Sequence, residues 1–237
     1  VRVMVMLKDH RLDLEAMARA ITPMTKLVFV ANPNNPTATI VTAAEVEAFM
    51  SRVPERTIVV FDEAYIEFAL GPDFPETLQY VKHGRKVAVL RTFSKASSLA
   101  GLRVGYCVAD ADAIALMNRI RQPFNVNSLA QAAALAALED DGHILECVRM
   151  IEAGRHFLYE EFDNLGIQYV PSRANFILVD AGRSAAEIYQ KLLHHGVIVR
   201  PMTPFGMGTA LRITVGTPEE NRKLVKALHA VLGKKSA

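Results

Sequence analysis

The sequence predicts an α/β fold, with a mostly parallel sheet flanked by helices and a smaller C-terminal α/β domain. Short β-branched runs alternate with segments of helical periodicity, which is the pattern of strands joined by helices. Several of these runs are apolar throughout, as is typical of parallel strands buried on both faces. The pattern changes after about residue 121, and we expect two domains, residues 1–145 and 146–237.

The first domain is predicted from apolar runs and helix-start signals. Strands are expected over residues 1–7, 26–30, 57–61, 86–90 and 104–108. A short helix is expected over 13–21, and a second one starts at the capping box formed by Thr42 and Glu45. A similar pattern, Ser128 with Gln131, predicts the start of an Ala-rich helix.

The second domain is predicted to begin inside a long helix over 144–165, which Gly166 ends. Further strands are expected over 175–179, 197–200 and 211–215, and a helix over 185–194. The last helix starts at Thr217, with Pro218 at its first position and Glu220 completing a capping box.

Composition excludes several classes of protein. The chain has 237 residues, of which 51% are hydrophobic and 22% charged, so it is not a disordered chain. A formal net charge of +2 without a basic cluster in the body of the chain gives no sign of nucleic-acid binding. No apolar run approaches the ~18 residues of a membrane helix. Two cysteines are too few for a disulfide framework or a thiolate zinc site, and we expect a reduced, cytoplasmic protein without a metal.

Chemically active side chains gather in the loops after three predicted strands. They are Asn35 after the strand at 26–30, Asp62 and Tyr65 after 57–61, and Thr92, Ser94, Lys95 and Arg103 after 86–90. Each loop alone fits an ordinary turn or helix cap. Functional residues of α/β proteins nevertheless collect after strand carboxyl ends, and the complete set carries more information than any single loop.

Together these side chains suit pyridoxal 5′-phosphate. Its aldehyde needs a lysine amine for a Schiff base, and its ring nitrogen needs a carboxylate that keeps it protonated. Its phenolic oxygen needs hydrogen-bond donors, and its phosphate needs hydroxyl groups and an arginine. An amide, a carboxylate, a phenol, a lysine, an arginine and two hydroxyls meet these needs.

The motifs resemble those of the fold-type I pyridoxal-phosphate enzymes in the class I/II aminotransferase superfamily, and most closely the histidinol-phosphate aminotransferase family. The resembling stretches cover residues 33–38, 61–65, 91–106, 121–127, 174–180 and 211–221. The resemblance implies that Lys95 forms the Schiff base and later carries a proton between the substrate and the cofactor. It further implies that Asp62 contacts the ring nitrogen, that Asn35 and Tyr65 bond the phenolic oxygen, and that Thr92, Ser94 and Arg103 hold the phosphate.

For the substrate, the resemblance implies that Arg212 binds an anionic group, with Arg200 and Asn175 assisting. Each has a plainer alternative: a strand-edge charge for Arg212, an ion pair between lobes for Arg200, and a turn for Asn175. The implied reaction moves an amino group from histidinol phosphate to 2-oxoglutarate in a homodimer. Alternatives are another class I/II aminotransferase of aromatic or aspartate type, a phospho-amino-acid decarboxylase, or a non-catalytic or truncated domain that binds the cofactor.

Two departures from the family pattern concern the fold. Ala38 stands where the family usually has glycine; alanine fits there if its φ angle is negative, whereas a positive φ or a close backbone approach calls for glycine. Residues 1–30 match none of the front segment that the family carries before its first strand seen here. We therefore expect a fragment of a longer protein rather than a degraded relative.

Overall fold

The computed structural model describes residues 9–233 and is an α/β protein, as predicted. The chain divides into two compact units, and each is described by itself. The first holds residues 1–34 and 40–145, and the second holds 35–39 and 146–237. The boundary between the two units, between residues 145 and 146, falls inside helix α6 (Asp141–Leu165). The short segment 35–39, which follows the first strand, groups with the second unit.

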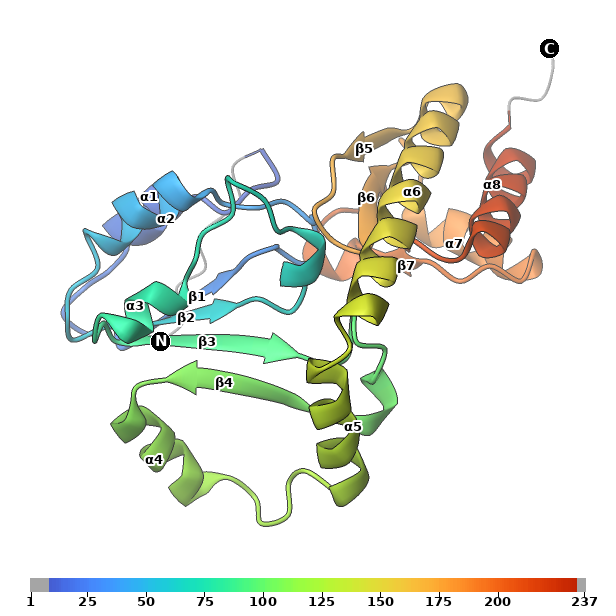
Figure 1. Ribbon diagram of the computed structural model, residues 1–237. Helices are drawn as coiled ribbons and strands as arrows, with labels where there is room; N and C mark the ends of the chain where they lie inside the picture. Colours follow the sequence, from blue (N-terminus) through green and yellow to red (C-terminus); the bar gives the residue numbers. More distant parts are fainter. Residues whose placement is uncertain (1–8, 234–237) are drawn as a thin grey trace. The chain divides into compact units, whose positions relative to one another are not determined.

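The first unit is built on a four-stranded sheet in the order β1-β2-β3-β4 (Figure 1). Its strands are β1 (Leu27–Ala31), β2 (Ile58–Asp62), β3 (Val87–Thr92) and β4 (Gly105–Ala109). β1, β2 and β3 run parallel, and β4 is antiparallel to β3. The predicted strand over 1–7 lies outside the described residues.

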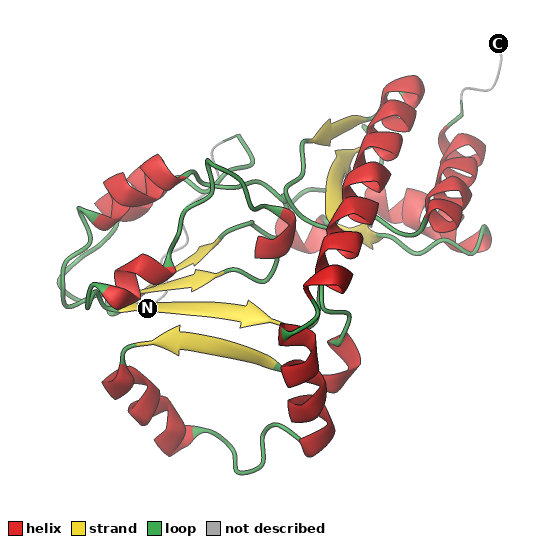
Figure 2. Ribbon diagram, in the orientation of Figure 1, coloured by secondary structure: helices red, strands yellow, loops and turns green. Residues whose placement is uncertain are grey.

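Helices cover one face of this sheet (Figure 2). The helices are α1 (Leu14–Arg19), α2 (Ala43–Met50) and α3 (Leu78–Lys82). Val30, Phe61 and Val89 point to this face and share a core with Phe49 of α2 and Tyr80 of α3. The opposite face is more open: Leu27 is 50% exposed and Phe29 61%.

The rest of the first unit includes helices α4 (Ala111–Ile120) and α5 (Ser128–Leu138), with 3₁₀ turns η1 (Ile66–Phe68) and η2 (Ala100–Leu102). The predicted capping box of α5 is wrong. Asn127 is the N-cap, and its side chain accepts a hydrogen bond from the Ala130 N–H, so Ser128 is already inside the helix. The capping box of α2 is confirmed.

The second unit has a fully antiparallel sheet in the order β5-β6-β8-β7. Its elements are β5 (Gln168–Val170), β6 (Phe176–Asp180), α7 (Ala185–His194), β7 (Arg200–Pro201), η3 (Thr203–Phe205), β8 (Ala210–Thr214) and α8 (Pro218–Leu232). The capping box of α8 is confirmed. The strand predicted over 197–200 is present only as the two residues of β7. Within residues 9–233, no helix is both long enough and apolar enough to cross a membrane.

Candidate active site

The parallel strands bring several predicted site residues to one edge of the first sheet. Asp62 is the last residue of β2 and pairs with Ala31 on β1 and Leu90 on β3. Thr92 ends β3 and pairs with Gly105, the first residue of β4. Because β4 runs the other way, the loop that precedes it reaches this same edge.

Lys95 lies in the loop that follows β3. The Ser94 N–H donates a hydrogen bond of 3.1 Å to Thr92 Oγ1, which tightens the turn leading to the lysine. The Lys95 Nζ lies 4.9 Å from the centroid of the Tyr65 ring. Tyr65 is only 7% exposed, so the ring is a fixed surface beside the amine. The structure therefore brings the predicted lysine and phenol together.

Asp62 and Arg103 are both exposed at this edge. The Ala64 N–H donates to Asp62 Oδ1 over 3.2 Å, which leaves the other carboxylate oxygen for a ligand. Arg103 ends η2 with φ +56°, in the left-handed region, and its Nη1 donates to the Ala100 carbonyl over 2.6 Å. Its chain therefore turns sharply into Val104 and β4.

The second unit holds the remaining predicted residues. Arg212, on β8, donates through Nη1 to Asn35 Oδ1 over 2.6 Å, and its guanidinium carbon lies 4.9 Å from the Phe176 ring centroid. Its Nε is buried and has no hydrogen-bond partner among the described residues. Arg200 on β7 is the register partner of Arg212, so the two arginines are neighbours across the sheet. Asn175 precedes β6 and accepts a hydrogen bond from the Val215 N–H through its main-chain carbonyl.

An alanine in the segment beside Asn35 adopts an unexpected conformation. Ala38 has φ +59° and is fully buried, so the condition of a negative φ, under which alanine would fit easily, is not met. Its carbonyl accepts a hydrogen bond of 2.8 Å from the Arg173 N–H. This turn therefore keeps the left-handed backbone that a glycine favours, although the residue is alanine.

The structure adds a buried charged cluster that the sequence did not single out. Glu63 follows Asp62, is 1% exposed, and accepts hydrogen bonds from Arg91 and from Thr77. Burial raises the pKa of Glu63, while the Thr77 hydrogen bond and the Arg91 charge oppose that rise. Burial also raises the pKa of Glu67, whose Oε2 is buried and has no hydrogen-bond partner within residues 9–233. The sequence offered one indication of this cluster: Glu63 and Arg91 are charged and stand directly beside the predicted site residues Asp62 and Thr92.

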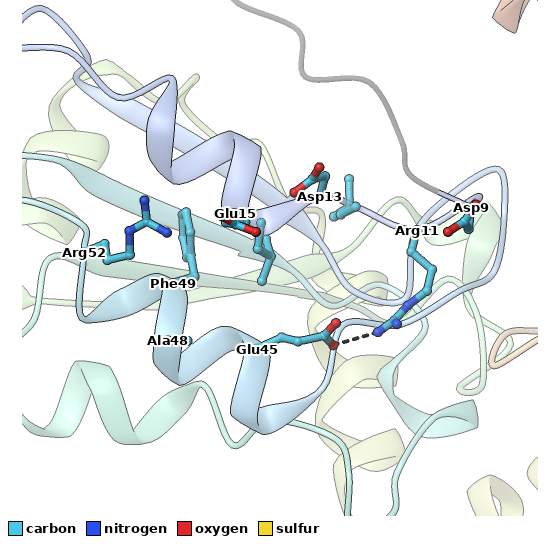
Figure 3. Close-up of a pocket in the computed structure, with 10 residues that line it drawn as sticks. Asp9, Arg11, Asp13, Glu15, Glu45, Ala48, Phe49 and Arg52 are labelled. Atoms are coloured by element: carbon cyan, nitrogen blue, oxygen red, sulfur yellow. Dashed lines mark hydrogen bonds and ion pairs between the residues drawn. The ribbon is translucent and has the colours of Figure 1, made fainter.

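A separate surface pocket lies between α1 and α2 (Figure 3). Arg11 and Glu45 form an ion pair of 2.6 Å at its wall, and Arg11 also donates to the Ile40 carbonyl. None of the predicted site residues lines this pocket. Three of its acidic side chains are engaged: Glu45 pairs with Arg11, Glu15 pairs with Arg19, and Asp13 caps α1.

Among the described residues, no cluster of three or more histidine, cysteine or acidic side chains is arranged to hold a metal ion. Burial raises the pKa of Cys107 on β4, which disfavours the nucleophilic thiolate form. The side chains gathered at the sheet edge instead comprise an amine, a carboxylate, a phenol, hydroxyls and an arginine. This set can hold an anionic aromatic aldehyde but offers no metal-ligand geometry.

Comparison with known proteins places the chain among aminotransferases. A model of the family "Aminotransferase class I and II" matches residues 1–228. The chain is 50% identical over 226 residues to a histidinol-phosphate aminotransferase of Moorella thermoacetica, covering 95% of this chain and 58% of that protein. It is 51% identical over 222 residues to histidinol-phosphate aminotransferase 2 of Pseudomonas fluorescens, covering 94% and 60%.

A solved structure shows the same fold. The crystal structure of histidinol-phosphate aminotransferase from Sinorhizobium meliloti, in complex with pyridoxal-5′-phosphate, aligns with a TM-score of 0.87 at 33% identity. The alignment covers 97% of this chain and 64% of that one. The fold class and the family resemblance predicted from the sequence are thus confirmed. The chain spans about three-fifths of the length of the curated relatives that it matches.

Proposed function

Because this chain belongs to the class I and II aminotransferase family, we propose that it binds pyridoxal 5′-phosphate and transfers an amino group from histidinol phosphate to 2-oxoglutarate. The observation that carries the proposal is the placement of Lys95 beside Tyr65, at the sheet edge that also bears Asp62. The histidinol-phosphate substrate comes from the names of the relatives. The reaction is that of the longer proteins, of which this chain spans part.

The side chains present fit the cofactor. Asp62 is an exposed carboxylate with a free oxygen, suited to a protonated ring nitrogen. Thr92, Ser94 and Arg103 supply hydroxyl groups and a cation for the phosphate, and Tyr65 and Asn35 supply polar groups for the phenolic oxygen. When bound, the cofactor acts as an electron sink that stabilises negative charge at the substrate α-carbon.

The protein's own residues then perform three tasks. Lys95 forms the covalent link and, once displaced, removes the proton from the substrate α-carbon as a general base. Arg212 supplies a planar, permanently charged donor group for a substrate anion. The hydrogen bond that Arg212 Nη1 donates to Asn35 Oδ1 holds the guanidinium in place. We propose Arg200 and Asn175 as its assistants.

The proposal includes a cytoplasmic homodimer. Leu116, Ile120, Leu129 and Leu135, on α4 and α5, are 60–83% exposed in the single chain, which supports a covered surface in the assembly. Sedimentation of the purified chain checks the dimer, and cell fractionation checks the location.

The central experiment uses Lys95→Ala with Lys86→Ala as its matched control. Lys86 is an exposed lysine just before β3, whereas Lys95 follows the other end of that strand. After incubation with pyridoxal 5′-phosphate and reduction with borohydride, mass spectrometry should find the cofactor on Lys95 in the wild-type protein and in Lys86→Ala. Lys95→Ala should carry none and should form no glutamate from histidinol phosphate and 2-oxoglutarate. Unchanged labelling and turnover in Lys95→Ala would contradict the assignment.

Substrate profiling separates the rival activities. Histidinol phosphate should outperform aspartate and aromatic amino acids as amino donor. Release of carbon dioxide from a phosphorylated amino acid without glutamate formation would instead indicate a decarboxylase. Cofactor binding with no turnover of any amine would indicate a non-catalytic domain.

A further inference from the structure

A buried ion pair joins the ends of the two central strands that carry the candidate site. Arg91 Nε and Nη2 each lie 2.9 Å from Glu63 Oε2, and Thr77 donates to the other carboxylate oxygen. The Glu63 side chain is wholly inaccessible, and that of Arg91 is 23% exposed. Glu63 is the residue after Asp62, and Arg91 is the residue before Thr92. The pair therefore lies within one residue of the site on both strands.

Strand alternation places the ion pair directly behind the site. Neighbouring residues of a strand point to opposite faces of a sheet. Glu63 thus shares the helix-covered face with Phe61, and Arg91 shares it with Val89. Asp62 and Thr92 point to the other face. The parallel pairing of β2 and β3 extends to Glu63, whose N–H donates a hydrogen bond of 2.9 Å to the Leu90 carbonyl.

Arg91 also lies beside β4. Its register partner there is Tyr106, so the two residues are direct neighbours across the sheet. Through Glu63 the same network reaches Thr77, the N-cap residue of α3. The ion pair thus joins β2 and β3 to the start of α3, at the level of Asp62 and the loop that carries Lys95.

Stability alone does not account for such a pair. Replacing a buried ion pair by apolar side chains of similar volume is often neutral or stabilising, because burying the charges costs as much as their attraction returns. What the pair supplies and an apolar pair does not is fixed geometry, since planar donors meet a carboxylate at set distances and angles.

We propose that the Arg91–Glu63 ion pair is a positioning element, which holds the ends of β2 and β3 so that Asp62 and Lys95 face the cofactor together. This rests on the proposed function, because Asp62 and Lys95 have that task only if the cofactor binds. Neither Arg91 nor Glu63 touches the reacting atoms in this arrangement. Their effect is exerted through the residues beside them.

The test uses an apolar replacement of the pair, Arg91→Met with Glu63→Leu, so that no unpaired charge remains buried. The matched control is Arg85→Met, at the other end of β3, where Arg85 Nη2 donates to the Met50 carbonyl over 2.8 Å. Arg91→Lys, which restores a charge opposite Glu63 but not the planar fork, measures partial rescue. Circular dichroism and urea unfolding establish that each variant folds.

Two measurements report positioning rather than stability. The first is the rate at which Lys95 captures pyridoxal 5′-phosphate, followed by borohydride trapping. The second is the pH midpoint of the absorption band of the lysine-bound cofactor, which depends on the carboxylate at the ring nitrogen. We expect the double variant to fold, to capture the cofactor about ten- to a hundredfold more slowly, and to show a displaced midpoint. Arg85→Met should match the wild-type protein, and Arg91→Lys should lie between.

The outcomes separate this inference from the function on which it rests. If the wild-type protein captures the cofactor on Lys95 and the folded double variant does so at the same rate with the same midpoint, the positioning role is overturned while the function stands. If the wild-type protein does not label Lys95, both are overturned. An equal slowing in Arg85→Met also overturns the inference, because the effect then follows from loss of an arginine at either end of β3.

Discussion

The sharpest structural prediction concerns Gly154, in the middle of α6. A Cβ atom on this residue would lie 2.5 Å from Val215 Cγ1 and 3.0 Å from Asn221 Nδ2. Neither neighbour can move easily. Val215 is 3% exposed and β-branched, and Asn221 is 2% exposed with its amide bonded to both the N–H and the carbonyl of Gly216, over 2.9 and 3.0 Å. An alanine here forces α6 away from the segment that follows β8.

The magnitude follows from two opposing terms. Replacing glycine by alanine inside a helix gains about 1 kcal/mol from backbone propensity. Overpacking a well-filled core costs about 1–3 kcal/mol, and a strained hydrogen bond of Asn221 adds about 1 kcal/mol. We therefore expect Gly154→Ala to lower the free energy of unfolding by about 1–3 kcal/mol, against the sign that helix propensity alone predicts.

Urea unfolding followed by circular dichroism measures this difference. Gly142→Ala is the matched control, because it lies in the same helix and its added Cβ would meet nothing closer than the Asp140 carboxylate at 3.5 Å. That variant should be as stable as the wild-type protein or up to about 1 kcal/mol more stable. If Gly154→Ala is also as stable as the wild-type protein, the packing between α6 and Val215 is looser than described and the reasoning fails.

Three further changes have expected outcomes. Thr217→Ala removes the capping box that Thr217 forms with Glu220 and should cost about 1 kcal/mol in urea unfolding, whereas Thr217→Ser should cost little. Asn32→Ala removes two buried hydrogen bonds of 3.0 Å to the Val41 main chain and should cost about 2–4 kcal/mol; a loss below 0.5 kcal/mol on that scale would contradict the buried network. Glu67→Gln should raise stability at pH 7.5 by about 1 kcal/mol, because the buried, unpaired Oε2 then carries no charge. Burial raises the folded-state pKa of Glu67. The contribution of this side chain to the free energy of unfolding is therefore complete below about pH 4.3, where it is protonated in both states, and is lost as the pH rises through the raised pKa. Urea unfolding should accordingly show the stabilities of the two proteins converging at pH 4.

Helix starts with local capping signals were predictable from the sequence. Thr42 and Thr217 each meet a glutamate three residues on, and both capping boxes are present. At Ser128 the same pattern misled, because Asn127 stands one position earlier and is at least as good a cap. Helix α4 was not predicted, although Ile114, Met117 and Ile120 recur at helical spacing in it.

Long-range contacts lay beyond the sequence. The hydrogen bond between Asn35 and Arg212 joins residues 177 positions apart, and no local pattern encodes it. Motif resemblance assigned the two residues separate tasks, whereas the structure shows them bonded to each other. The φ angle of Ala38 could not be decided from the sequence for a related reason: the neighbouring main chain, including the hydrogen bond from the Arg173 N–H, holds a left-handed backbone that alanine disfavours.

The contrast between Asp62 and Glu63 shows most directly what the fold decides. An antiparallel strand with one wet face alternates polar and apolar residues, so its sequence reveals which side each residue faces. β2 is buried on both faces: Val59, Val60 and Phe61 are all at most 7% exposed. The sequence before Asp62 and Glu63 therefore shows no alternation of polar and apolar residues. It does not indicate which of the two acids faces a ligand. Helices α1 to α3 cover the Phe61 face and so bury Glu63 against Arg91, while Asp62 stays exposed. Two adjacent carboxylates thus acquire different chemistry from the packing of distant helices, because that packing alone determines which of them meets solvent.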